Sequence, residues 1–72
     1  MAYAIRELDV VALMVDLPEH ALSRGQVGTV VTDLAPDTVE VEFVDPHGAT
    51  YAMLAVPKSQ LLRLHHERVA AA

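Results

Sequence analysis

Hydrophobic and polar residues alternate most regularly over residues 38–44, TVEVEFV. Val39, Val41 and Phe43 fall on one face of this segment, and Glu40 and Glu42 fall on the other. An alternation with a period of two is the pattern of a β-strand that buries one face. The segment therefore predicts a half-buried strand with an acidic outer face.

Four further segments predict strands on either side of it. Residues 9–15 and 27–31 are rich in β-branched side chains. Residues 50–56 and 61–66 are short apolar runs bounded by turn signals. Such runs are typical of strands in a small all-β protein.

Two of these strands carry additional expectations. The strand at 9–15 is apolar on both faces, so we expect both faces to be covered, one of them by another subunit. In the last strand, Leu62 and Leu64 share one face, and Arg63 and His65 share the opposite face.

Turn sequences separate the predicted strands. Residues 23–26 suit a type II turn, because Gly25 supplies the positive φ that its third position requires. Residues 36–37 and 45–48 carry the residue types that type I turns prefer, and residues 57–60 are long enough for one 3₁₀ turn. The residues assigned to structural turns are Gly25, Gly28, Asp45, Pro46 and Gly48.

The order of these elements predicts the fold. A first strand, a long loop, a three-stranded meander, a 3₁₀ turn and a closing strand match a small five-stranded SH3-like barrel, which is an all-β fold. We expect a single domain over residues 1–72, with a flexible lead over 1–8 and a flexible tail over 67–72. An oligonucleotide-binding barrel is the alternative, but it usually needs a longer chain and an intervening helix.

Composition limits what such a domain can bind. The 72 residues include no cysteine, and 10 acidic residues against 5 basic ones give a net charge of −5. Without disulfides or bound metal, so small a domain must pack well, oligomerise or do both. Its acidity argues against nucleic acid and anionic membranes as partners. The apolar run 10–15 is too short to span a membrane and the start of the chain lacks signal-peptide features, so we expect a cytoplasmic protein.

The sequence predicts no catalytic residues, no metal site and no cofactor. Glu40 and Glu42 would lie about 7 Å apart along a strand, and such a pair is ordinarily a solvated strand face. His65 and His66 are adjacent on a predicted strand and would point to opposite faces, whereas the other two histidines lie in separate loops. No hydroxyl lies in a nucleophile-elbow context.

The glycine pair in LSRGQVGTVV has a structural interpretation. A phosphate-binding loop runs from a strand into a helix and commonly ends in Gly-Lys-Ser/Thr, which is missing here. An RNA contact of the KOW type needs cations beside the loop, and only Arg24 is present. We therefore expect Gly25 to permit the turn and Gly28 to let the strand bend or approach another backbone.

Two blocks of the sequence, LPEHALSRGQVGTVV at 17–31 and the segment 39–52 that includes VEFVDPHGATYA, resemble a small bacterial family of unknown function, family 4926. The resemblance implies an SH3-like barrel and no established activity. It also implies glycine at position 21, where this chain has Ala21. Members of the family look like short stand-alone proteins, which suggests a partner-binding or antitoxin-like role.

The resulting functional hypothesis is a non-catalytic cytoplasmic module that binds a protein partner and also self-associates. A proline-rich peptide is an improbable ligand, because the chain has no Trp and Phe43 falls on the core face. Alternatives are a KOW-like RNA-binding barrel and a domain that binds a small ligand or metal beside the long loop. The candidate partner-binding residues are Pro18, Glu19, His20, Arg24, Glu40 and Glu42.

Overall fold

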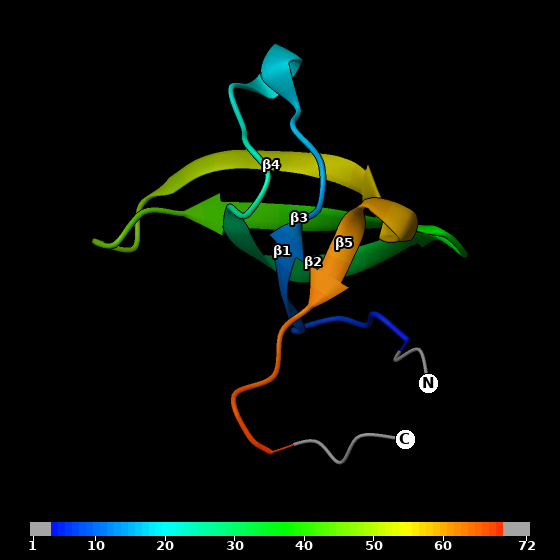
Figure 1. The fold of residues 1–72 in the computed structure, drawn as a ribbon. Coiled ribbons are helices and arrows are strands. Elements are labelled where there is room, and N and C mark those ends of the chain that lie inside the picture. The colour runs from blue at the N-terminus through cyan, green and yellow to red at the C-terminus, as the bar shows by residue number, and fades with distance from the viewer. Residues whose placement is uncertain (1–3, 69–72) are drawn as a thin grey trace.

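The computed structural model describes residues 4–68, which form one five-stranded antiparallel sheet with two 3₁₀ turns (Figure 1). The elements are β1 (Val10–Leu13), η1 (Pro18–His20), β2 (Val27–Ala35), β3 (Thr38–Val44), β4 (Thr50–Pro57), η2 (Lys58–Gln60) and β5 (Leu61–Arg63). The strand order is β4-β3-β2-β1-β5. This confirms the predicted all-β fold, with the long loop after β1 and the 3₁₀ turn before β5.

Strand β2 belongs to both halves of the sheet. Its first residues pair with β1, as in Val11↔Gly28, whereas its remainder pairs with β3, as in Val30↔Val41. Strands β1 and β5 consequently run across the direction of β3 and β4 (Figure 1). The sheet therefore folds over on itself, and its concave side becomes the core.

The core is made by side chains from every strand, the long loop and the lead. The inner face predicted for β3 is confirmed, because its two valines and Phe43 are completely buried. Ile5, in the lead, is also buried, a contribution that the sequence pattern did not predict. The buried residues are Ile5, Val11, Leu13, Leu22, Val30, Val39, Val41, Phe43, Val56 and Leu61.

The predicted turns have the expected backbone geometry. Gly25 has a φ of +93°, and Gln26 N–H donates to Ser23 O over 3.1 Å, as a type II turn requires. Gly48 has a φ of +84° and donates its N–H to Asp45 O. The Asp45 carboxylate fixes this second turn by accepting hydrogen bonds from the His47 and Ala49 N–H groups.

The close approach predicted for Gly28 is also present. A Cβ atom at this position would lie 2.6 Å from Val41 Cγ1 and 2.9 Å from the carbonyl oxygen of Glu42. Both distances are shorter than any ordinary van der Waals contact. Only glycine lets β2 cross β3 at this separation.

Three strand predictions were wrong in extent. β1 is shorter than 9–15, β5 ends at Arg63 instead of position 66, and β2 continues past position 31 to Ala35. β2 is longer because its far end has a partner strand, with Thr32↔Glu40 and Ala35↔Thr38. β5 pairs only with the short β1, and its last pair, Val11↔Arg63, lies near the beginning of that strand.

The apolar face of β5 is oriented differently from expectation, and one apolar face of β1 is exposed. In β5, Leu61 is buried and Leu62 is 53% exposed, so the predicted apolar face of this strand points outward. In β1, Val11 and Leu13 are buried, but Val10 and the following Met14 remain exposed. Within residues 4–68 the outer face of β1 is thus uncovered, and the expectation that another subunit covers one face of this strand stays a prediction.

Candidate functional site

The long loop between β1 and β2 projects beyond β4, with η1 at its tip (Figure 1). Leu17 and Leu22 close its neck by two backbone hydrogen bonds, Leu17 N–H to Leu22 O at 2.8 Å and Leu22 N–H to Leu17 O at 3.1 Å. Leu22 is buried and Leu17 packs against the core. The loop tip is therefore held in one shape by its neck, although Pro18–His20 are themselves exposed.

Ala21 ends η1 in the left-handed conformation, with φ 55° and ψ 37°. Its N–H donates to Pro18 O at 3.1 Å, which completes the 3₁₀ turn. A Cβ atom is unfavourable in this conformation, whereas glycine adopts it without strain. This geometry explains why the resemblance led us to expect glycine at position 21.

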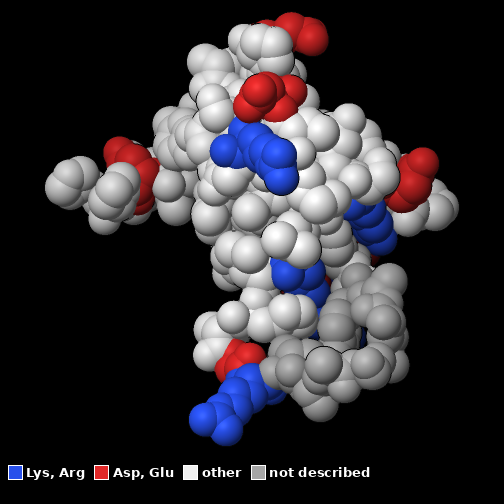
Figure 2. Space-filling model, viewed as in Figure 1, with Lys and Arg blue, Asp and Glu red and all other residues white. Residues whose placement is uncertain are grey.

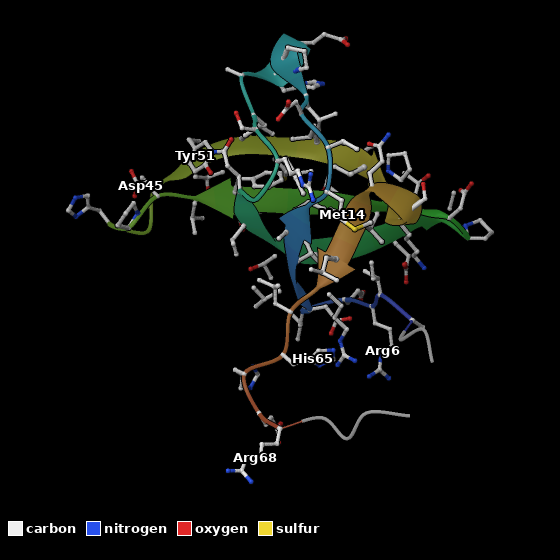
Figure 3. The ribbon with its side chains drawn as sticks, viewed as in Figure 1. Arg6, Met14, Asp45, Tyr51, His65 and Arg68 are labelled. Atoms are coloured by element: carbon white, nitrogen blue, oxygen red, sulfur yellow. The ribbon has the colours of Figure 1, made fainter. Side chains whose placement is uncertain are left out.

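The base of the loop is tied to the sheet by side chains. Asp16 Oδ1 accepts a hydrogen bond of 2.9 Å from Arg24 N–H, which joins the two arms of the loop. Gln26 Nε2 donates to Tyr51 Oη at 3.1 Å and so joins the loop to β4. Tyr51, labelled in Figure 3, has its ring 6.3 Å from that of Phe43 in the core. The predicted contact residues of the loop thus rest on a rigid base.

The second set of predicted contact residues lies along β3. Glu40 and Glu42 are half-buried on its outer face, and Glu42 accepts a hydrogen bond from the Thr50 hydroxyl. Asp37 and Asp45 lie beyond the two ends of the same strand. We call these four carboxylates the acidic stripe.

Negative charge is concentrated in the part of the chain that contains the acidic stripe. Residues 25–60 carry five acidic side chains and one basic side chain, Lys58, which pairs with Asp33 at 3.4 Å. The other described residues, 4–24 and 61–68, carry five acidic and four basic side chains. Four of the five units of negative charge therefore lie on the half of the sheet formed by β2, β3 and β4.

The structure does not bring the two predicted sets together. Pro18–His20 lie at the tip of the projecting loop, whereas Glu40 and Glu42 lie on the outer face of β3 (Figure 1). Among the described residues no hydrogen bond or ion pair joins them. They are two surfaces, and Arg24 belongs to the base of the first.

A comparison with protein families identifies the chain. Residues 7–63 match the family described as Domain of unknown function (DUF4926). The chain belongs to this family. Comparisons with curated proteins and with solved structures gave no match.

The DUF4926 match contains all five strands, the projecting loop and the acidic stripe. Within the described part of this DUF4926 protein, no three His, Asp or Glu side chains are grouped in a way that could hold a metal ion. His65 and His66, with Val10 and Leu64, line an open hollow of about 270 Å³. Residues 4–68 contain no helical segment with the length and hydrophobicity of a membrane span.

One surface of this DUF4926 protein was not among the predicted sites. Six large apolar side chains are exposed on or beside the outer side of β1, β2 and β5: Leu8, Val10, Met14, Val27, Val31 and Leu62. We call this surface the outer apolar face. The signal in the sequence was the presence of apolar residues at both odd and even positions of 10–15, but the pattern alone did not say which face would stay uncovered.

Proposed function

We propose that this DUF4926 protein is a non-catalytic interaction module of the bacterial cytoplasm that binds a basic protein partner. The partner would be a neighbouring small protein that the module inhibits or regulates, as an antitoxin does. The observation that carries the proposal is the uneven charge, with five carboxylates and one paired lysine on residues 25–60.

Such a distribution favours a cationic partner for electrostatic reasons. Charge of one sign concentrated on one side of a small protein steers an oppositely charged partner and accelerates its association. It also rejects acidic competitors, including nucleic acid. The acidic stripe runs along β3 for its whole length, about 25 Å from Asp37 to Asp45 at strand spacing.

The projecting loop supplies a second contact in this proposal. Pro18, Glu19 and His20 are exposed, and the Leu17–Leu22 neck fixes their conformation before any partner arrives. A contact segment that is already ordered loses little conformational entropy on binding. Rigidly presented loops are common recognition elements on small β-scaffolds.

The test uses the product of the gene next to the one that encodes this chain. Wild-type protein and the double variant Glu40→Lys/Glu42→Lys are titrated against it by calorimetry at low and high salt. We expect binding that weakens with salt, and a loss of affinity of about tenfold or more in the double variant. A matched charge reversal on the other half of the protein, Glu67→Lys, should bind like wild type. Absence of binding, or equal affinity of the two variants, would contradict the proposal.

A further inference from the structure

We propose that the outer apolar face is the interface of a homodimer in which β1 packs face to face against β1 of a second copy of this chain. This proposal does not depend on the basic partner above, because the face is centred on β1 and β5 and shares only β2 with the acidic half of the sheet. It rests on the register of three strands, on the conformation of Leu8 and on the distribution of charge.

The strand register makes the outer apolar face continuous. Ala12 pairs with Val27 of β2 on one side and with Leu62 of β5 on the other, so these three side chains form one row. Val10 pairs with Thr29 and accepts a hydrogen bond from Leu64 N–H, which forms the next row. Neighbouring rows lie about 7 Å apart, and neighbouring strands about 5 Å apart. Over β1, β2 and β5 neither row contains a charged side chain, and the second row is bordered on β3 by Glu42, which pairs with Thr29.

Leu8 extends this surface in an unusual conformation. It has a φ of 72° and is 82% exposed. Its N–H donates to Val30 O, and Val30 N–H donates to Asp9 O, both at 2.9 Å. This is the pattern of a G1 β-bulge, in which Leu8 takes the position that normally holds glycine. A bulky side chain that is strained and 82% exposed adds little packing to the single chain, which points to a contact outside it.

The size of the face suits a dimer better than a lone chain. Among the described residues, six of the ten large apolar side chains that are exposed belong to this face. From Leu8 to Met14 the face extends about 20 Å along β1, with about 10 Å between the axes of β2 and β5. Continuous apolar patches of a few hundred Å² mark interaction sites, and such a patch can form the centre of an interface that buries about 800 Å² per copy.

The distribution of charge favours a second copy of the chain as the partner at the outer apolar face. Residues 4–24 and 61–68, which contribute four of the six side chains of the outer apolar face, carry four basic and five acidic side chains. This side is nearly neutral in a chain whose net charge is −5, so two copies meet here with little repulsion. Figure 2 shows the surface over β1 and β5 as largely uncharged, with basic groups at its upper and lower margins. A basic partner is better attracted by the opposite half.

The two ends of the face favour an antiparallel arrangement. The loop end carries Asp16, Glu19 and Arg24, whereas the opposite end carries Glu7 and Glu67 with Arg6 and Arg68, the two arginines labelled in Figure 3, so the loop end is the more negative of the two. A twofold axis that lies in the plane of the interface, perpendicular to β1, brings the loop end of each copy to the Arg6 end of the other. The same residues then meet on both sides, as in an isologous dimer.

The oligomeric state tests the proposal directly. Sedimentation equilibrium is measured from about 1 to 500 μM on wild type, Leu62→Glu and Leu34→Glu. The two leucines are 53% and 51% exposed. Leu34, however, lies where β2 pairs only with β3. We expect a dimer for wild type and Leu34→Glu, and at least a tenfold larger dissociation constant for Leu62→Glu, because a carboxylate in an apolar interface is unpaired. Circular dichroism checks that each variant is folded.

Two outcomes would overturn the proposal. One is a wild-type protein that stays monomeric over the whole concentration range, which would assign the face to a different protein. The other is equal dissociation constants for Leu62→Glu and Leu34→Glu. Dimerisation of Glu40→Lys/Glu42→Lys is measured in parallel and should equal that of wild type. A failure of basic-partner binding is then distinguishable from a failure of dimerisation.

Discussion

Gly28 of β2 lies so close to Val41 of β3 that no side chain fits between them, since a Cβ atom on Gly28 would stand 2.6 Å from Val41 Cγ1. Val41 is completely buried. This contact sets how closely the two halves of the sheet can approach where β2 passes from β1 to β3. The two glycines thus have different roles: Gly25 permits the turn, and Gly28 permits the close packing of β2 on β3.

Replacing Gly28 by alanine should lower the free energy of unfolding by about 2–3 kcal/mol, because the added methyl group overlaps both Val41 and the Glu42 carbonyl. Urea denaturation followed by circular dichroism measures this loss. Gly25→Ala is the matched control: nothing lies within 4 Å of its Cβ position, and the positive φ alone should cost about 1–2 kcal/mol. A Gly28→Ala variant as stable as wild type would refute the packing role.

Replacing Ala21 by glycine should raise the free energy of unfolding by about 1 kcal/mol, because the left-handed strain disappears. Ala49→Gly is the control, since Ala49 is an exposed residue without a positive φ. There the same substitution only adds freedom to the unfolded chain and should lower stability by about 0.5–1 kcal/mol. Thermal denaturation of both variants would show shifts of opposite sign, and two shifts of equal sign would contradict the assignment.

Leu8 offers a related prediction in the Leu62→Glu background, which removes any contribution of dimerisation. Leu8→Gly should stabilise this background by about 1 kcal/mol, because glycine fits the bulge and little buried surface is lost. Leu34→Gly, at a strand position that is 51% exposed and has no positive φ, should lower stability by up to about 1 kcal/mol. Urea denaturation would disprove the strain at Leu8 if both variants lost stability equally.

The turn between β3 and β4 depends on one carboxylate. Asp45→Ala removes the acceptor of two backbone hydrogen bonds, from His47 at 2.8 Å and Ala49 at 3.0 Å. The free energy of unfolding should fall by about 1–2 kcal/mol. Asp33→Ala, which breaks only the exposed ion pair with Lys58, should change it by less than about 0.5 kcal/mol. Equal effects of the two substitutions, measured by urea denaturation, would contradict this account.

The alternative of RNA binding is tested by chromatography. With one paired lysine on residues 25–60 and a net charge of −5, the protein should pass through a heparin column near physiological salt without retention. Retention of wild type that Arg24→Ala abolishes would instead favour a KOW-like contact beside Gly25. Arg68→Ala is the control for a loss of positive charge far from that turn.

The candidate sites could be predicted only in part. The residues of the projecting loop and of the acidic stripe were identifiable from turn signals and from alternation along β3. The sequence did not show that these residues form two separate surfaces, because the distance between them depends on the direction in which the loop leaves the sheet. For residues 9–15 the sequence predicted that another subunit would cover one apolar face, but which face stays exposed could not be identified, since exposure depends on what other segments cover.

The sequence by itself determined which residues of each strand share a face, where the turns lie and that Gly28 needs space. These are local properties, set by the period of two and by the conformations open to glycine and proline. Tertiary structure alone decided that Leu61 and not Leu62 enters the core, that β2 extends to Ala35 and that the outer side of β1 stays exposed. These features depend on pairing between strands distant in the chain, and local patterning does not specify which strand edge finds a partner.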